Sequence, residues 1–295
     1  MISKEEIKLN INSEWHIPLD TQKQYRYGLC RFIINTCQKI NLSYETASLA
    51  MLIINHFFIK NLYFNFNKLT IACSALLLSS KNETSQSKFN DIWKEYSFTG
   101  NKGLESAEEP HKIKEHIGKY EIYILKQLNY NIPEEFPYDF IYAYSDLLYP
   151  DNSQEISNVS IKVAVDSYFT YANNIYKSYV VAIACLVIAA KFLEIPTVFE
   201  ENFKHIDNMR KIHRKNISIE EFNKELSQYD SQFILRRNNK QEFSTEEDDY
   251  FSKLSLHQKL HPSLKIDDLI ECIYMIMEYY EDMRDKNNLN LNSMK

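Results

Sequence analysis

Glycine and proline are scarce in this chain of 295 residues, with 4 and 7 copies respectively. Rossmann, barrel and sandwich folds need many tight turns, and such turns draw heavily on these two residue types. Hydrophobic residues, by contrast, make up 44% of the chain, enough for a sizeable core in one large or two ordinary domains. The composition therefore predicts an all-helical protein.

Signals of several protein classes are also missing. No apolar run approaches the roughly 20 residues that a membrane span needs, and the first residues show no hydrophobic stretch typical of a secretory signal. The net charge of −6 argues against a nucleic-acid binder, because such proteins usually carry a basic face. We therefore expect a soluble intracellular protein with no membrane contact and no direct nucleic-acid partner.

Motifs for metal, phosphate or covalent chemistry are absent from the sequence. No two cysteines have the C-x-x-C spacing, and there is no Gly-rich phosphate loop. His56 lies in an apolar helical pattern, which indicates a packed residue and not a ligand. The sequence thus predicts no cofactor, no metal and no catalytic residue, and it favours a binding protein over an enzyme. The five cysteines are expected to be reduced and buried: Cys30, Cys37, Cys73, Cys185 and Cys272.

Apolar residues recur at spacings of three and four in several segments, which indicates amphipathic helices. Ser43 is a plausible N-cap for one of them. A short helix is also expected within the polar stretch 83–110, at 89–96. The longer helices are expected at about 21–40, 44–60, 112–128, 138–149, 157–174 and 266–283.

Two further helices have no polar face at all. One covers Ile71 to Lys81 and the other ends at Lys191, so each is expected to be enclosed by other helices. Aligning the two terminal lysines pairs Leu76 with Leu186, which indicates a weak internal repeat. The sequence therefore predicts two domains, 1–150 and 151–295, the second with a long polar insertion at about 196–247. We expect Lys191 to be structural.

The order of these segments resembles that of the cyclin family over most of the chain. The segment ACSALLLSSKNET resembles the family's Ala-Cys-x-x-Leu-Ala-x-Lys-x-Glu-Glu, and FPYDFIYAYSDLL resembles its His-Pro-Tyr-x-Phe segment. YRYGLCRFIINTCQKINL and IAAKFLEIP are similar to segments of the transcriptional cyclins of the K, T and L types. The resemblance implies an all-α fold of two tandem five-helix cyclin boxes, with an N-terminal helical segment before the first.

The same resemblance implies a function. The chain would be a regulatory subunit, not an enzyme, that binds and activates a cyclin-dependent protein kinase of the transcription-regulating type. It would form a heterodimer with that kinase in the nucleus, with the cytoplasm as a second compartment. In the family, the residues matching Lys81 and Glu121 hydrogen-bond kinase backbone, and Glu83, Leu77 and Ile124 complete the expected kinase-binding set.

Three departures from the family pattern leave alternatives open. Of the Met-Arg-Ala-Ile-Leu patch that docks substrates in other cyclins, the chain keeps Arg26 and Leu29, a possible remnant of a docking patch. Thr84 replaces the last glutamate of the hub motif, and the arginine of His-Arg-Phe-Tyr is missing from the segment 55–58. The alternatives are a cyclin-fold scaffold of the general-transcription-factor kind and an orphan cyclin-like protein that activates no kinase.

Overall fold

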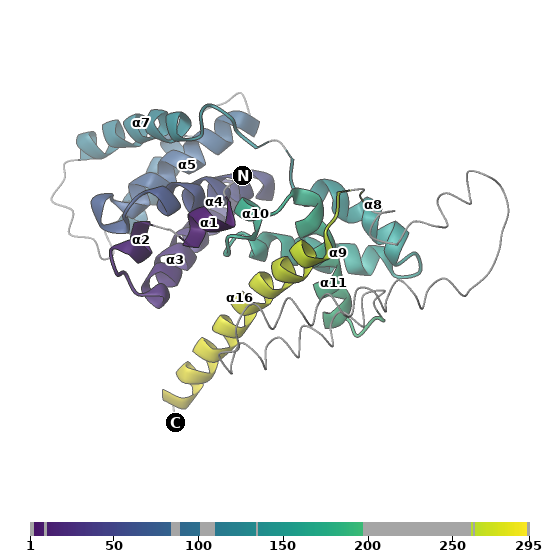
Figure 1. Cartoon of the computed structure of the whole chain (residues 1–295). Coiled ribbons are helices and arrows are strands. Elements are labelled where there is room, and N and C mark those ends of the chain that lie inside the picture. The colour runs from purple at the N-terminus through teal and green to yellow at the C-terminus, as the bar shows by residue number, and fades with distance from the viewer. Residues whose placement is uncertain are drawn as a thin grey trace, which may run out of the picture.

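The computed structural model describes residues 3–8, 11–83, 89–100, 110–133, 135–196, 261 and 263–293. All regular secondary structure in these ranges is helical, which confirms the predicted all-α class. The helices form two bundles that lie side by side (Figure 1). Their bounds are α1 (Lys4–Lys8), α2 (Ile11–Glu14), α3 (Leu19–Lys39), α4 (Tyr44–Lys60), η1 (Tyr63–Asn65), α5 (Lys68–Glu83), α6 (Phe89–Gly100), α7 (Pro110–Gln127), α8 (Tyr138–Leu148), α9 (Ser153–Ser167), α10 (Ala172–Ile175), α11 (Ser178–Phe192) and α16 (Ile266–Ser293).

Both apolar helices lie where the sequence predicts, at the centres of the bundles. Every residue from Ile71 to Ser80 of α5 is buried, as is every residue from Val180 to Ala190 of α11. Helix α5 packs on α3, α4, α6 and α7, and α11 packs on α8, α9 and α16. All five cysteines are free and buried, and burial raises the pKa of the Cys30 thiol to about 12.

Local capping explains why the second helix of the first bundle starts where it does. Ser43 is the N-cap of α4, and its hydroxyl accepts a hydrogen bond of 3.1 Å from the amide of Thr46. The predicted range 44–60 matches the observed helix. The short helix expected at 89–96 also forms, as α6, and it continues to Gly100.

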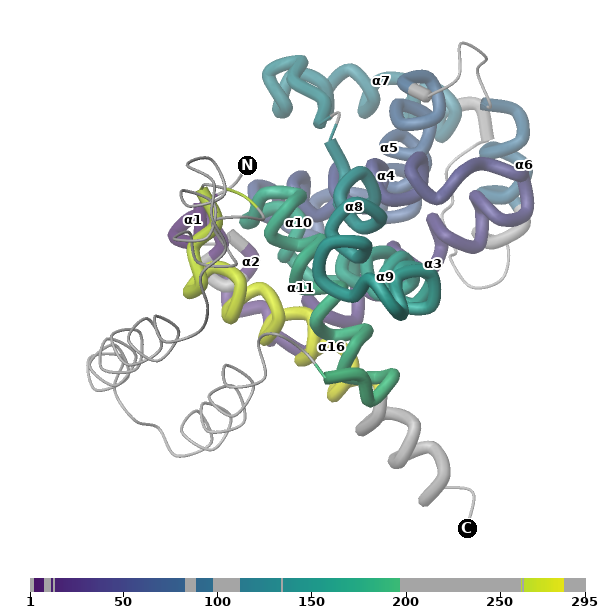
Figure 2. Tube along the Cα trace, turned by 90° about the vertical axis from the view of Figure 1, so that its right-hand side faces the viewer, coloured from purple at the N-terminus to yellow at the C-terminus, as the bar shows by residue number. Residues whose placement is uncertain are grey.

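Helix α8 packs on α9 and α11, and Figure 2 shows these three helices together. The sequence pattern instead predicts this segment as part of the first domain, residues 1–150. The division into domains stays a prediction, but this packing favours a boundary in the non-helical segment before Tyr138. The insertion at 196–247 lies almost entirely outside the described residues.

One expected helix, at 157–174, is wrong in detail because it is two helices, α9 and α10. The chain turns between them, and carbonyl groups of the turn accept hydrogen bonds from the first bundle. Arg26 Nε donates to the Phe169 carbonyl at 2.8 Å. Asn55 Nδ2 donates to the carbonyls of Tyr168 and Thr170 at 2.9 and 3.2 Å. These buried contacts use carbonyl groups that a continuous helix would have engaged internally.

The N-terminal segment forms elements that the periodicity did not reveal. Asn12 is fully buried, and its side chain donates to the carbonyls of Phe58 and Asn61 and accepts from the amide of Tyr63. Lys4 forms ion pairs with Asp268 and Glu271 of α16. The segment therefore touches both bundles.

Candidate protein-binding site

The end of α5 presents a charge directly after a fully buried stretch of helix. Lys81 follows directly on the buried run, and its side chain is 45% exposed. Its Nζ lies 2.7 and 2.9 Å from the two carboxylate oxygens of Glu121 on α7. The Glu121 side chain is 13% exposed, so the ion pair is open to solvent mainly on the lysine side. The structure thus brings together two residues that lie 40 positions apart in the sequence.

The relative position of α5 and α7 is supported by a buried hydrogen bond. The Ser74 hydroxyl contacts the carbonyl oxygen of Ile117 at 2.9 Å, and it also contacts the carbonyl oxygen of Thr70 in its own helix at 2.8 Å. Ser74 lies two turns before Lys81, and Ile117 lies one turn before Glu121. A buried polar contact of this kind favours one register of α7 on α5, because a slip would leave the hydroxyl without its partner on α7.

Two of the remaining predicted kinase-binding residues, Leu77 and Ile124, are buried. Leu77 and Ile124 are 3% and 1% exposed, so their side chains belong to the core. Glu83 is the last residue of α5. A direct contact of Leu77 or Ile124 with a partner therefore stays a prediction, and in this structure both residues act as supports for the two helices.

Two residues of the exposed surface beside Glu121 were missed by the sequence analysis. Ile122 is 55% exposed and Tyr123 is 40% exposed. The Tyr123 ring packs against Phe57 and Phe66 of the first bundle, with ring centroids 5.9 and 6.3 Å away. Their position next to Glu121 could have indicated a role in the site. The sequence pattern alone, however, does not show which side of α7 is exposed at these positions.

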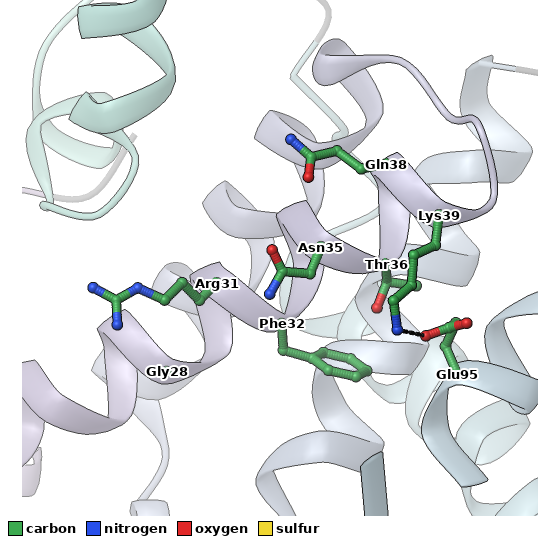
Figure 3. Close-up of a pocket in the computed structure, with 8 residues that line it drawn as sticks. All are labelled: Gly28, Arg31, Phe32, Asn35, Thr36, Gln38, Lys39 and Glu95. Carbon is green, nitrogen blue, oxygen red and sulfur yellow. Dashed lines mark hydrogen bonds and ion pairs between the residues drawn. The ribbon is translucent and has the colours of Figure 1, made fainter. Parts of the chain in front are cut away.

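The expected remnant of a docking patch stays a prediction, but both of its residues are buried. Arg26 is 6% exposed and Leu29 is 4% exposed, because both face the interior of the two-bundle assembly. The Arg26 guanidinium lies over the ring of Tyr171, 4.3 Å from its centroid, and it holds the turn between α9 and α10. A groove on the outer side of α3 is formed by other residues of this helix and by Glu95 of α6 (Figure 3).

His56 is confirmed as a packed residue. Its Nε2 atom is buried and has no hydrogen-bond partner among the described residues. Burial, followed by the nearby charge of Lys60, lowers the pKa of His56 to about 4. No group of three or more His, Cys, Asp or Glu side chains in the described ranges could hold a metal ion. None of the helices there combines the length and apolar character needed to cross a membrane.

Comparison with known proteins assigns the first bundle to a family. The fold is a double bundle of helices around two buried central helices, with a charged pair at the end of one of them. Residues 1–133 match the family model "Cyclin, N-terminal domain". Over these residues, somewhat less than half of its length, the chain is similar to cyclins.

Curated relatives share a modest part of the sequence. Cyclin-K of Danio rerio is 22% identical over 58% of this chain and 40% of its own length. Cyclin pch1 of Schizosaccharomyces pombe is 26% identical over 65% of this chain and 54% of its own. The chain thus spans about half the length of these relatives or less.

Solved structures share the fold. A chain in the crystal structure of the yeast RNA Pol II CTD kinase CTDK-1 complex is 16% identical, with a TM-score of 0.56, over 67% of this chain and 64% of that one. A chain of the yeast TFIIK (Kin28/Ccl1/Tfb3) complex is 15% identical, with a TM-score of 0.50, over 65% of this chain and 85% of that one. At these identities the likeness concerns the fold alone.

Proposed function

We propose that this protein is a regulatory cyclin subunit that binds and activates a cyclin-dependent protein kinase of the transcription-regulating type. The observation that carries the proposal is the pair formed by Lys81 and Glu121 at the edge of a cyclin N-terminal domain. The relatives are cyclins by name, and one structural neighbour comes from a kinase complex. The chain itself would supply no chemistry, only binding energy that shifts the kinase between two states.

The geometry suggests how the pair would act on a partner. Lys81 is held by both oxygens of the Glu121 carboxylate, yet almost half of its side chain is exposed. An ammonium group has three donors, so Lys81 can donate to a kinase carbonyl while it stays paired with Glu121. The exposed side chains of Ile122 and Tyr123 would add apolar area beside this contact. Glu83, Leu77 and Ile124 complete the proposed site, the last two by supporting the helices.

The proposed compartment is the nucleus, with the cytoplasm as a second one. It follows from the proposed partner, since one structural neighbour is a chain of the yeast RNA Pol II CTD kinase CTDK-1 complex. Fluorescence microscopy of the tagged full chain would test it. A signal excluded from nuclei would contradict this part of the proposal.

Affinity capture of the tagged full chain, followed by mass spectrometry, would test the kinase partner. We expect a cyclin-dependent kinase to copurify, and the purified chain alone to show no phosphotransfer. Lys81→Ala or Glu121→Ala should weaken binding of that kinase by roughly 2–5 kcal/mol, because each change leaves one charge of the site without its partner. Lys191→Ala, at the end of α11, is the matched control. Equal capture by all of these variants would contradict the proposed site.

A further inference from the structure

Asn61 ends α4 at the corner where the chain turns toward η1, and its side chain contacts α7. The residue is only 9% exposed. Its Nδ2 atom donates to the carbonyl of Phe57 in its own helix at 2.8 Å and to Oε1 of Gln127 at 3.1 Å. Its Oδ1 atom accepts a hydrogen bond of 3.4 Å from the hydroxyl of Tyr123. One buried amide therefore satisfies a carbonyl in the last turn of α4 and also contacts two residues of α7.

The same contacts form a closed ring of three hydrogen bonds. Gln127 Nε2 donates to the Tyr123 hydroxyl at 3.3 Å, so Asn61, Tyr123 and Gln127 each contact the other two. Because Phe57 and Phe66 also pack against its ring, Tyr123 is restrained although it is 40% exposed. An exposed side chain loses rotamer freedom when a partner covers it, and this loss lowers affinity. In Tyr123, part of that loss has already occurred on folding.

Asn12 of α2 holds the backbone at the same corner. Its Nδ2 atom donates to the carbonyls of Phe58 and Asn61 at 2.6 and 3.1 Å, and its Oδ1 atom accepts from the amide of Tyr63 at 2.9 Å. Asn12 is fully buried, so the loss of these contacts would leave polar groups without partners away from water. The N-terminal segment is therefore linked to the exposed side of α7 through two amides, those of Asn12 and Asn61.

The body of α7 is held by other contacts. Its core residues Ile113, Ile117 and Ile124 are 5% exposed or less, and Ser74 contacts the carbonyl of Ile117. The three bonds of the ring measure between 3.1 and 3.4 Å, at or beyond the long end of the usual range, so each contributes little to stability. We therefore expect the ring to affect the orientation of Tyr123 more than the packing of α7.

We propose that Asn61 is a positioning residue for kinase binding, which acts by holding Tyr123, and that Asn12 keeps Asn61 in place. The ring would fix Tyr123 in the orientation that meets the kinase beside Lys81 and Glu121, so less rotamer freedom is lost when the complex forms. The inference rests on the proposed function, because a kinase is the partner whose affinity would change. It adds the N-terminal segment to the elements that set this affinity.

The first experiment needs no kinase. A fluorinated tyrosine, placed at position 123 of the full chain, reports the surroundings of this ring by fluorine NMR. Asn61→Leu keeps the size of the side chain and removes its three hydrogen bonds, so the resonance should move toward its position in urea or broaden. Asn12→Ala should move it in the same direction. The matched control is Asn173→Leu, which removes a side-chain amide bond to Ser167 in the second bundle and should leave the resonance unchanged.

The second experiment measures the affinity of the captured kinase in a double-mutant cycle. Asn61→Leu and Tyr123→Phe should each weaken binding by about two- to tenfold, the effect expected when one more side chain must be ordered on binding. The double variant should bind no more weakly than the weaker of the two single variants, because both changes remove the same restraint. Asn173→Leu should bind the kinase as the wild type does.

Several results would overturn the inference. A fluorine resonance that is the same in Asn61→Leu and the wild type would do so, even with normal kinase capture. Losses that multiply in the double variant would also do so, since Asn61 would then act without Tyr123. Should Asn61→Leu fail to fold, Gln127→Met opens the same ring, and an unchanged resonance there is equally decisive. Capture of no kinase by the wild type would instead refute the proposed function, while the fluorine signal still decides whether Asn61 holds Tyr123.

Discussion

The two central helices, α5 and α11, are both buried along their bodies but differ where they end. Both are buried on all sides over ten or more consecutive residues, and both continue into a lysine. At the end of α5, Lys81 meets a carboxylate on α7. At the end of α11, Lys191 is followed by Phe192, which is 50% exposed and packs on Tyr280 of α16.

The buried bodies of these two helices stabilise the fold, whereas their exposed ends are available for binding. A fully apolar helix stabilises a bundle by the area that it removes from water, whatever residues follow it. The ends of the helices carry little of that area, so they can differ without cost to the core. The first bundle presents a charged pair there, and the second presents an aromatic contact to its own last helix. We therefore expect binding of a kinase to depend on the first end and stability to depend equally on both bodies.

The largest expected effect tests whether the two bodies are equivalent. Leu76 and Leu186 occupy matched positions in the two helices, and both are fully buried. Leu76→Ala and Leu186→Ala should each lower the free energy of unfolding by about 2–5 kcal/mol, through lost burial and the cavity left behind. Urea unfolding followed by circular dichroism measures the loss.

Tryptophan fluorescence provides a second probe of unfolding for the two leucine variants. Trp15 and Trp93, the two tryptophans of the chain, both lie in the N-terminal half, so their signal reports on the first bundle. Because Arg26 and Asn55 bind the turn between α9 and α10, we expect fluorescence and circular dichroism to give the same midpoint for both variants. Separate midpoints, or a loss below about 1 kcal/mol for one variant, would break the equivalence of the two helices.

The sequence predicted the bodies of these helices better than their ends. Apolar residues on every side leave no other placement for α5 and α11 than the centre of a bundle, and Ser43 marks the start of α4 through a local contact. The turn between α9 and α10 was not predictable, because hydrogen bonds from Arg26 and Asn55, more than 100 positions away, support it. The candidate site was also predictable only in part. Lys81 and Glu121 were identified by resemblance. The burial of Arg26 was not predictable, because it depends on the second bundle packing against this residue.

A smaller effect on stability should arise at low pH from His56, which lies in the first bundle. His56 lies on α4, which packs against α5, and its lowered pKa of about 4 compares with an ordinary value of 6.5. As the pH falls below 6.5 the unfolded chain binds a proton at this residue, whereas the folded chain does so only near pH 4. Folding stability due to His56 is therefore complete above pH 6.5 and is lost between these two values, by up to about 3 kcal/mol.

The variant His56→Gln isolates this contribution from that of other titrating groups. Urea unfolding at pH 7.5 and pH 4.5, followed by tryptophan fluorescence, should show a smaller loss for His56→Gln than for the wild type. Glu6 and Lys60 also act on His56, and both are kept in the variant. Equal losses would show that His56 binds its proton in the folded chain at an ordinary pH.

The smallest expected effect on stability tests whether Lys81, at the end of α5, serves binding and not folding. Lys81→Met removes the ion pair with Glu121 and keeps most of the apolar length of the side chain. Because the lysine is almost half exposed, the free energy of unfolding should fall by no more than about 1 kcal/mol. Capture of the kinase should fall by more than that, since the proposed contact loses a charge that the partner has desolvated.

Lys39→Met provides a matched control within the same bundle. It removes the ion pair between α3 and α6, in which the lysine is 50% exposed and Glu95 is 20% exposed. Both variants should lose a similar, small amount of stability in urea unfolding, and only Lys81→Met should lose the kinase. If Lys81→Met instead cost as much stability as Leu76→Ala, weakened capture would follow from unfolding alone. Lys81 would then have a structural role, as we expect for Lys191. The difference between the ends of α5 and α11 would no longer indicate a binding site.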